Sequence, residues 1–248
     1  MARLRQNDLT NLPEGGKVTM HNTLVSASHG LTLGEKRLIS MAVAKLSPSA
    51  AALPVKPVKI LAVDFAEQFG IEPHVAYREL RAAQENLFNR YVRHIEHFGA
   101  NGSRVRVSKM RWVSSIHYEK GGGEVSLSFA PEVSQFLVQL KKHFTSYQLS
   151  KAAALRSTYS WRLFENLEKF RNTGVWEVEI DRFHTIMDTP KSYQSNFAQT
   201  RRWVIDPSIS ELAAQTNISA QFEPIKKGRK VVRLRFTFSA ASQMSLPI

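Results

Sequence analysis

Residues 191–212, KSYQSNFAQTRRWVIDPSISEL, carry side chains of the types that bind DNA. Amides, hydroxyls and two adjacent arginines come first, and a proline, Pro207, follows them. Asn and Gln can form two hydrogen bonds with the edge of adenine, and Arg can do the same with guanine. The free N–H groups at the start of a helix favour phosphate. The stretch therefore predicts a helix whose first half faces a DNA groove.

The candidates for DNA contact in this stretch are Lys191, Ser192, Gln194, Ser195, Asn196, Gln199, Arg201 and Arg202. Those at the start of the helix are expected to hold phosphate, and the amides of Asn196 and Gln199 are expected to reach bases. For Arg201 and Arg202, the alternative to a DNA contact is an ion pair with Glu179 or Asp206.

An ideal helix would separate apolar residues from amides in this stretch. The expected apolar face is Ala198, Ile205, Ile209 and Leu212, and the expected opposite face is Asn196, Gln199, Thr200 and Trp203. This geometry leaves the two arginines at the flank of the apolar face, from which long side chains can still reach outward. A kink at Pro207 would shift the register, and we take this as the hypothesis for why the proline is there.

The charge of the chain favours a polyanionic partner. Lys and Arg number 34 against 21 Asp and Glu, which gives a formal net charge of +13. Nucleic acid is the first expectation for such a balance, an anionic membrane surface the second, and a basic protein kept soluble by its charge the third. The basic residues cluster between 189 and 238 and between 90 and 111, so two contact surfaces are expected.

Further candidates for DNA contact lie in these clusters and on a helix of the first half. KKGRK at 226–230 is the tip of a predicted hairpin, where Lys226, Lys227 and Arg229 are expected to touch phosphate; an idle solvated turn is the alternative. The candidates on a predicted helix and a predicted hairpin of the first half are Arg78, Arg81, Arg104 and Arg106.

Catalytic and metal chemistry finds little support. No G-x-x-x-x-G-K-[ST] phosphate loop is present, and the absence of cysteine excludes disulfides, thiolate zinc sites and cysteine nucleophiles. His94 and His97 lie in an alternating run, where a spacing of three puts them on opposite faces of a strand. The His-apolar-His strand of a tyrosine-based nicking enzyme is not visible. We expect no enzyme activity, no cofactor and no metal.

Length and hydropathy favour two ordinary domains without a membrane segment. The chain has 248 residues, of which 43% are hydrophobic. No apolar run approaches the roughly 20 residues that a membrane span needs, and the chain opens on polar residues rather than on a signal peptide. The cytoplasm is the expected compartment.

The same order of elements is expected twice along the chain. Helical periodicity at 32–46 and at 156–170 starts each half, and a short strand follows at 58–63 and at 174–180. Asp64 and Asp181 are each expected to cap a short helix. A longer helix comes next, from Pro73 in the first half, and strands with alternating residues close each half, ending in a hairpin at 218–239 in the second.

This order of elements is that of a winged helix. In such a domain the second helix of the helix-turn-helix enters the major groove. The expected fold class is α+β, with two tandem winged-helix domains. A flexible tail is expected at 1–21, a first domain at 22–143 and a second at 144–248. Residues 131–155 are expected to form a largely helical connection. The second domain is expected to supply most of the groove recognition.

Several stretches resemble the theta-type plasmid replication initiators, the family that includes the initiator of the F plasmid. They are LTLGEKRLI, STYSWRLFENL, DPSISEL and IKKGRKVVRLRFTF. The match runs in order over about residues 22 to 240. The resemblance implies two winged-helix domains related by pseudo-two-fold symmetry. It also implies monomers that bind repeated origin sites (iterons) and dimers that bind an inverted repeat and repress their own gene, with the dimer surface in the first domain.

The resemblance further implies host partners, namely the host initiator and the replicative helicase, in a bacterial cytoplasm at the nucleoid or plasmid. The chain departs from the family where some relatives run three basic residues together, because Arg201 and Arg202 are followed here by Trp203. The usual E-I-N after the proline reads Glu211, Leu212, Ala213. A winged-helix repressor without an origin function, a DNA-nicking enzyme and an RNA-binding protein stay open as alternatives.

Overall fold

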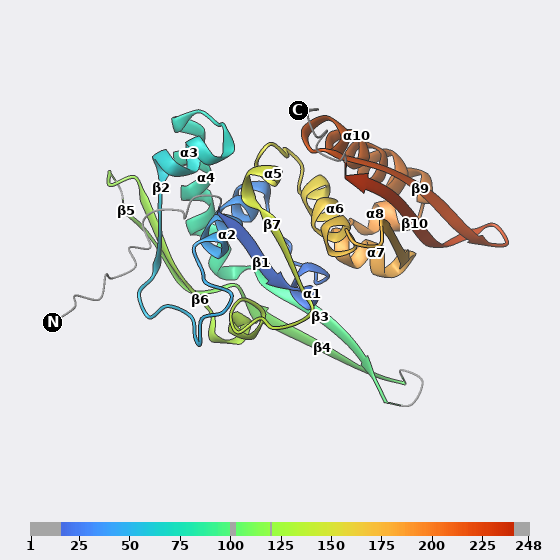
Figure 1. The fold of residues 1–248 in the computed structure, drawn as a ribbon, viewed down its shortest axis with the longest axis horizontal. Helices are drawn as coiled ribbons and strands as arrows, with labels where there is room; N and C mark the ends of the chain where they lie inside the picture. Colours follow the sequence, from blue (N-terminus) through green and yellow to red (C-terminus); the bar gives the residue numbers. More distant parts are fainter. Residues whose placement is uncertain (1–15, 100–102, 120, 241–248) are drawn as a thin grey trace, which may run out of the picture.

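The computed structural model describes residues 16–99, 103–119 and 121–240, and it contains two winged-helix domains in tandem (Figure 1). The first is built from α2 (Leu33–Ala44), β2 (Val58–Leu61), α3 (Ala62–Phe69), α4 (Pro73–Asn86), β5 (Val113–Glu119) and β6 (Glu124–Phe129). The second is built from α6 (Thr158–Lys169), β8 (Val175–Glu179), α7 (Ile180–Met187), α8 (Lys191–Gln194), α9 (Phe197–Thr200), the π turn η4 (Arg201–Ile205), α10 (Asp206–Gln215), β9 (Ile218–Lys227) and β10 (Lys230–Ala240).

The two domains have sheets of the same topology. In each three-stranded sheet, the strand before the helix-turn-helix pairs with the last strand of the hairpin, giving the orders β2-β6-β5 and β8-β10-β9. All of these pairs are antiparallel. The expected fold class, α+β with two tandem winged helices, is therefore confirmed.

Local signals explain where several helices begin and end. Thr32 and Glu35 form a reciprocal capping box at the start of α2. Gly70 ends α3 in the left-handed region, at φ 54°, which glycine adopts without strain. Pro73 stands in the first turn of α4, where its missing N–H costs nothing.

The predicted caps at Asp64 and Asp181 are wrong. The structure starts α3 at Ala62 and α7 at Ile180, so both aspartates lie inside the first turn, and neither helix has a side-chain cap. A carboxylate in the first turn still complements the helix dipole, which explains why both helices carry one there.

A two-stranded ribbon is inserted in the first domain between its second helix and its wing. It consists of β3 (Tyr91–Phe98) and β4 (Arg104–Arg111), after the short 3-10 helix η1 (Leu87–Asn89), and it forms a sheet of its own. Figure 1 shows it projecting from the body, as the β9–β10 hairpin does from the second domain. The hairpin candidates Arg104 and Arg106 therefore lie on this ribbon and not on the wing β5–β6.

The connection between the domains differs from the largely helical one expected. Residues 131–155 contain the 3-10 helix η3 (Pro131–Phe136), the strand β7 (Phe144–Gln148) and the short helix α5 (Leu149–Ala153). Strand β7 pairs with β1 (Lys17–His21), which precedes α1 (Asn22–Val25). Residues 17–21 thus belong to the fold, and the expected boundary at 143/144 cuts a paired strand from its partner. Residues 1–15 of the expected tail lie outside the described residues.

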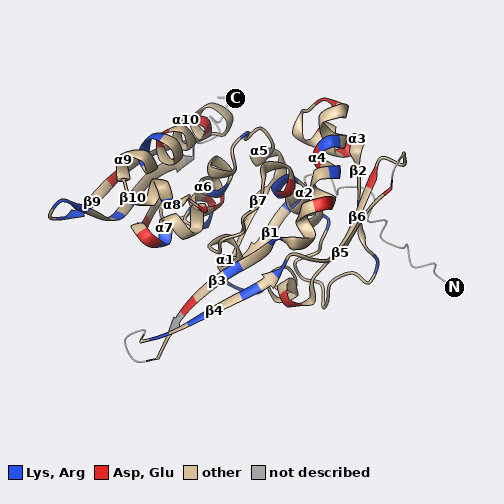
Figure 2. Ribbon diagram, turned by 180° about the vertical axis from the view of Figure 1, so that it is seen from behind, with Lys and Arg blue, Asp and Glu red and all other residues tan. Residues whose placement is uncertain are grey.

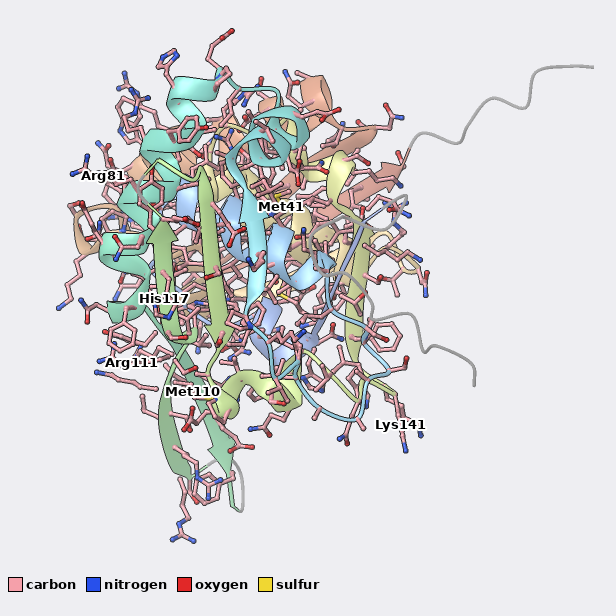
Figure 3. All side chains as sticks on the ribbon, turned by 90° about the vertical axis from the view of Figure 1, so that its left-hand side faces the viewer. Met41, Arg81, Met110, Arg111, His117 and Lys141 are labelled. Atoms are coloured by element: carbon pink, nitrogen blue, oxygen red, sulfur yellow. The ribbon has the colours of Figure 1, made fainter. Side chains whose placement is uncertain are left out.

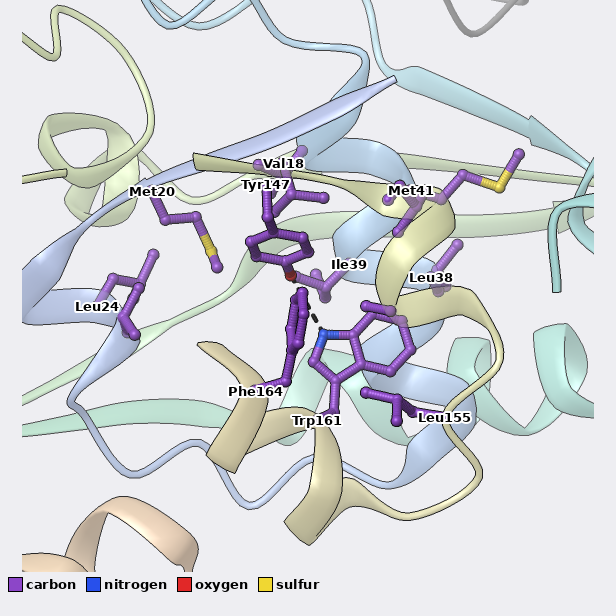
Figure 4. Close-up of a cluster of buried hydrophobic side chains, with 14 of the residues drawn as sticks. Val18, Met20, Leu24, Leu38, Ile39, Met41, Tyr147, Leu155, Trp161 and Phe164 are labelled. Carbon is purple, nitrogen blue, oxygen red and sulfur yellow. Dashed lines mark hydrogen bonds between the residues drawn. The ribbon is translucent and has the colours of Figure 1, made fainter. Parts of the chain in front are cut away.

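The core at the junction of the domains is built around α6. Figure 4 shows Trp161 and Phe164 of this helix beside Tyr147 of β7 and Val18 of β1. All four are at most 3% exposed. The Trp161 Nε1–H donates to the Tyr147 hydroxyl over 3.2 Å, and that hydroxyl donates to the Glu165 carboxylate over 2.7 Å. The first helix of the second winged helix is therefore packed into the first domain.

Candidate nucleic-acid interface

The helix predicted to enter a groove is a continuous helical segment, which we call the recognition helix (197–215). It begins at Asn196, whose side-chain oxygen accepts from the Ala198 N–H over 3.0 Å. It then passes through α9, the π turn and α10 without leaving helical geometry. With α7 it forms the helix-turn-helix of the second domain. Its position confirms the order of elements expected from the sequence.

The π turn shifts the register of the recognition helix by one residue. The Asp206 N–H donates to the carbonyl of Arg201, five residues earlier instead of four. Pro207 follows directly; it has no N–H, and its ring would crowd the carbonyl of Trp203 in a regular α-helix. The proline therefore follows a widened turn, and the register of the helix changes in residues 201–205, just before Pro207.

Two of the expected face assignments are wrong because of this shift. Thr200 is 0% exposed, although an ideal helix placed it among the amides. Ala198, placed on the apolar face, is exposed, and Phe197 packs against the core instead. The π turn holds one residue more than a regular turn, so before it positions 197 and 200 face the core, instead of 198 with 201 at its flank. Arg201 is thereby carried out to solvent.

The two adjacent arginines have different surroundings. Arg201 forms an ion pair with Asp206, with Nε 3.1 Å from Oδ2, which is the structural alternative named for it. Its guanidinium also lies 5.6 Å from the centre of the Phe222 ring. Arg202 has no acidic partner among the described residues and stacks 4.9 Å from the ring centre of Trp203. Arg202 is therefore the better placed of the two for DNA.

The amide of Gln199 is tied to Trp203. The indole Nε1–H donates to the Gln199 Oε1 over 2.8 Å, one turn along the helix. Trp203 is 49% exposed on the side of the helix away from the core. Gln199, Arg202 and Trp203 therefore form a connected group on the exposed face, which we call the Trp203 cluster.

The other polar candidates lie before the recognition helix begins. Lys191, Ser192, Gln194 and Ser195 occupy α8 and its end, a separate short turn with all four side chains exposed. Gln194 donates to the carbonyl of Thr189 over 2.6 Å, and Ser195 donates to that of Ser192 over 3.3 Å. These bonds hold the turn of the helix-turn-helix. The backbone N–H groups at the start of the recognition helix therefore lie in the turn after Asn196, and not beside these four residues.

The tip of the β9–β10 hairpin carries cations without partners. Lys226, Lys227 and Arg229 are exposed, and among the described residues none has an acidic group within ion-pair distance. Gly228 makes the turn with φ 62°. Figure 2 shows basic residues gathered at this tip. We call it the wing tip (226–230).

The base of the same hairpin is neutralised, which the charge count did not reveal. Arg235 and Arg233 bond Glu177 over 2.9 and 3.2 Å, and Arg233 lies 3.8 Å from Glu179. The pKa of Glu177 is lowered, chiefly by the hydrogen bond from Arg235. The sheet register places these residues opposite one another. In the basic cluster at 189–238, the positive charge without nearby acids among the described residues is thus concentrated at the wing tip and on the recognition helix.

In the first domain, Arg78 and Arg81 lie on α4, the counterpart of the recognition helix. They line a shallow groove of about 480 Å³ with Tyr77 and Glu85 of the same helix and Tyr118 of β5. Arg81 lies 3.5 Å from Glu85, both well exposed. Figure 3 shows Arg81 and His117 along one side of this domain, above Arg111 of the ribbon. This side combines a helix and a wing, as the second domain does.

Glu79 does not reduce the positive charge of the exposed face of α4, although it lies between Arg78 and Arg81 in the sequence. It faces inward and binds the buried Arg37 over 2.8 Å. On the ribbon, Arg104 and Arg106 both stack on the ring of Phe98, at 5.2 and 5.0 Å, and Arg106 lies 3.4 Å from Glu96. The ribbon is therefore a basic surface separate from the groove on α4.

The contact that holds the helix-turn-helix to the first domain was missed by sequence reasoning. Asp188, in the left-handed region at φ 51°, accepts hydrogen bonds from the N–H groups of His29 and Gly30 over 3.0 and 3.1 Å, and from the Ser28 hydroxyl. Arg162 lies 3.7 Å from the same carboxylate and donates to the Ala27 carbonyl. Ser28, His29 and Gly30 lie 158 to 160 residues before Asp188, so no local pattern could indicate these contacts.

Within the described ranges there is no group of three or more His, Cys, Asp or Glu residues that could hold a metal. No helix in the same part of the chain is long and apolar enough to cross a membrane. The side chains that stand out at the surface are instead cations and amides on two helix-turn-helix units and their hairpins. Fold and surface together define a DNA-binding protein with tandem winged helices.

Comparison with known proteins places the chain in a family. Residues 17–168 match the family described as Initiator Replication protein, WH1, and residues 179–238 match Initiator Rep protein, WH2. The chain belongs to this family of replication initiators. The predicted resemblance to theta-type plasmid initiators is thereby confirmed.

Individual relatives support the same family. The Replication initiation protein of Escherichia coli is 27% identical, over 91% of this chain and 70% of its own length. The PI protein of Escherichia coli is 24% identical, over 90% of this chain and 82% of its own. The solved structure of the Pi initiator protein in complex with iteron DNA has a TM-score of 0.75 and 23% identity, over 93% of this chain and 99% of that one. That likeness supports the fold.

Proposed function

We propose that this initiator binds repeated duplex sites at a plasmid origin, reads them chiefly with the recognition helix, and thereby starts replication. The observation that carries the proposal is the recognition helix itself. Its exposed face presents Arg202 beside Gln199 and Trp203, and a basic wing tip lies on the hairpin that follows it. In the part of the chain that the structure describes, neither Arg202 nor the cations at 226, 227 and 229 form an ion pair. A helix with amide and guanidinium groups beside a basic wing combines base recognition with phosphate contact.

The groove on α4 is the proposed second contact. Arg78 and Arg81 would hold phosphate there, and Arg104 and Arg106 on the ribbon would add to the same electrostatic attraction. Lys191, Ser192 and Ser195 are proposed to touch the backbone at the edge of the recognition helix, and Arg201 to do so beside Asp206. Gln194 and Asn196 serve first to hold the turn and the helix start.

The family membership supports further proposals. A dimer that uses the first domain would bind an inverted repeat and repress the gene of the protein. The host initiator and replicative helicase would be its protein partners in the bacterial cytoplasm. The protein is proposed to bind DNA without cutting it; incubation of supercoiled origin DNA with magnesium or manganese should produce no nicked circles.

Selection of DNA fragments tests the main proposal. Random genomic and plasmid fragments are selected at about 150 mM salt, where non-specific binding is weak, and then sequenced. Directly repeated sites of about two helical turns are the expected result. The variant Arg202→Ala should lose this enrichment, whereas Arg233→Ala, which removes an arginine already paired with Glu177, should keep it. A flat profile for the unaltered protein would refute sequence-specific binding.

A repressor without an origin function is the second candidate. The same fold and the same surface would serve it, so DNA binding alone does not distinguish the two. A plasmid that carries only the selected sites and a marker, with the protein supplied in trans, should replicate if the protein is an initiator. Failure to replicate, together with repression of a reporter, would favour the repressor.

A further inference from the structure

We infer that the Trp203 cluster recognises thymine, with the indole ring against the thymine methyl group and the Gln199 amide on the neighbouring O4. The inference rests on the proposed function, because it names the base that the recognition helix reads. It concerns a position where this chain has an aromatic residue instead of a third consecutive basic one.

The first step is the placement of Trp203. It lies in the π turn, on the face opposite Thr200 and Val204, which are both 0% exposed. In the described part of the second domain, the exposed large hydrophobic side chains are Val175 and Trp203. An exposed indole on a groove-facing helix leaves apolar area in water, and such area stabilises only when a partner covers it.

The second step concerns which groups of the indole ring remain free to contact DNA. Its Nε1–H, the one polar group of the ring, is already donated to the Gln199 Oε1 over 2.8 Å. The Arg202 guanidinium lies over one face of the ring, 4.9 Å from its centre, and Trp203 still remains 49% exposed. The ring itself therefore presents an apolar surface with no donor for phosphate. In the major groove, the apolar feature that distinguishes one base is the C5-methyl group of thymine.

The third step concerns Gln199. An indole N–H can only donate, so the amide atom that faces it must be the oxygen. The amide nitrogen of Gln199 is then left with N–H groups to donate, close to the edge of the ring. A donor beside an apolar surface complements thymine, which presents the O4 acceptor next to its methyl group in the major groove.

Replacing thymine by deoxyuridine tests the inference, because the change removes the methyl group and keeps O4. Each thymine of the selected site is replaced singly in synthetic duplexes, and affinity is measured by fluorescence anisotropy. The unaltered protein should lose about three- to tenfold in affinity at one position of each repeat, the loss expected for one methyl contact. Trp203→Ala should bind the thymine duplex more weakly and show no loss at that position. Trp203→Phe should keep part of the loss.

Trp203→Arg, which restores a third basic residue, serves as the matched variant. It should bind well through added charge and yet be indifferent to the uracil substitution. Equal uracil profiles for the unaltered protein and Trp203→Ala would overturn the inference while leaving the proposed function in place. Absence of any selected site would overturn both. Because Trp203 lies outside the core, each variant should fold. Thermal unfolding of each variant checks this and excludes misfolding as the cause of a change in affinity.

Discussion

Arg201 and Arg202 are neighbours of the same type whose surroundings make them unequal. Arg201 is held by Asp206, which stands five residues on, the spacing that a π turn brings onto one face. Arg202 has the aromatic face of Trp203 and no acid among the described residues. The ion pair with Asp206 competes with phosphate for the Arg201 guanidinium. For these two arginines, the surroundings of the side chain therefore matter more for DNA binding than its chemical type.

The wing tip offers a prediction about charge. Replacing Lys226, Lys227 or Arg229 singly by Ala should weaken binding to specific and random duplexes to a similar degree, because phosphate carries no sequence information. Each change should also reduce the slope of log affinity against log salt by about 1 if one phosphate contact is lost. The check is a salt titration of affinity for both kinds of duplex.

Arg235→Ala is the control for that series. Its guanidinium is bound to Glu177 at the base of the same hairpin, so its removal should change the slope little. Equal changes of slope at the tip and at the base would contradict the assignment of phosphate contact to the tip.

His29 offers a prediction about pH. Burial, then the nearby Arg162 and Lys36, hold the pKa of His29 well below its ordinary value of 6.5, and its Nε2 lies 2.7 Å from the Leu24 carbonyl. Protonation therefore favours the unfolded chain. The contribution is complete above about pH 6.5 and is lost as the pH falls below it, by up to about 1.4 kcal/mol per pH unit.

Urea unfolding of the protein between pH 7.5 and 5 should therefore show a falling free energy of unfolding, and His29→Gln should show a shallower fall. The slope will not vanish, since burial also lowers the pKa of His21, His94 and His184. The control is His74→Gln, which makes the same change of residue type at an exposed position of α4. An unchanged slope in His29→Gln would contradict the assignment.

Among the elements, the recognition helix depends on its start as well as on its π turn. The Asn196 side chain satisfies the Ala198 N–H at the first turn. Asn196→Ala should lower the free energy of unfolding by about 1 kcal/mol, as loss of an N-cap does. Asn196→Asp keeps the cap and adds a negative charge where DNA is expected.

The two Asn196 variants separate stability from binding. Asn196→Asp should unfold like the unaltered protein and still bind the selected DNA more weakly, whereas Asn196→Ala should be less stable with a smaller change in affinity. Denaturant unfolding and anisotropy with the same duplex give the two numbers. Tight binding by Asn196→Asp would place the helix start away from phosphate.

In the whole molecule, the two domains are joined through polar contacts that are buried or partly buried. Lys36 of α2 binds Glu165 of α6 over 2.7 Å with both side chains buried, and burial lowers the pKa of Lys36 against the opposing effect of Glu165. Asp188 ties the end of α7 to the loop before α2. Such contacts have directional partners, so they define how one domain is placed against the other.

Asp188→Ala should loosen that placement. The free energy of unfolding should fall by about 1.5–3 kcal/mol, because charge-assisted hydrogen bonds are lost and two backbone N–H groups lose their partner. On DNA, affinity for a full repeat should fall more than affinity for the half that the recognition helix reads. Insertion of one or two base pairs between the halves should then cost the variant less than it costs the unaltered protein.

Asp181→Ala is the comparison for that experiment, since Asp181 lies exposed at the other end of α7. It should respond to inserted base pairs as the unaltered protein does. If Asp188→Ala were as sensitive to spacing as Asp181→Ala, the domains would be held by other contacts.

The sequence by itself determined the class of fold and the general chemistry. Periodicity, Gly70, Pro73 and the wing-tip turn are local signals, and local geometry decides where helices and hairpins begin and end. The net charge pointed to a polyanion because charge is additive along a chain. The candidates Arg202, Lys226, Lys227 and Arg229 could accordingly be named from the sequence.

Only the tertiary structure decided the register of the recognition helix and the partners of its charges. The π turn accompanies the burial of Thr200 and Val204 and the packing of Phe197 against the core, and the periodicity of an ideal helix does not indicate it. The pairing of β1 with β7 and the contacts of Asp188 join residues more than 120 positions apart. Contacts between residues so far apart leave no periodic pattern in the sequence, because they form only when tertiary packing brings the two segments together.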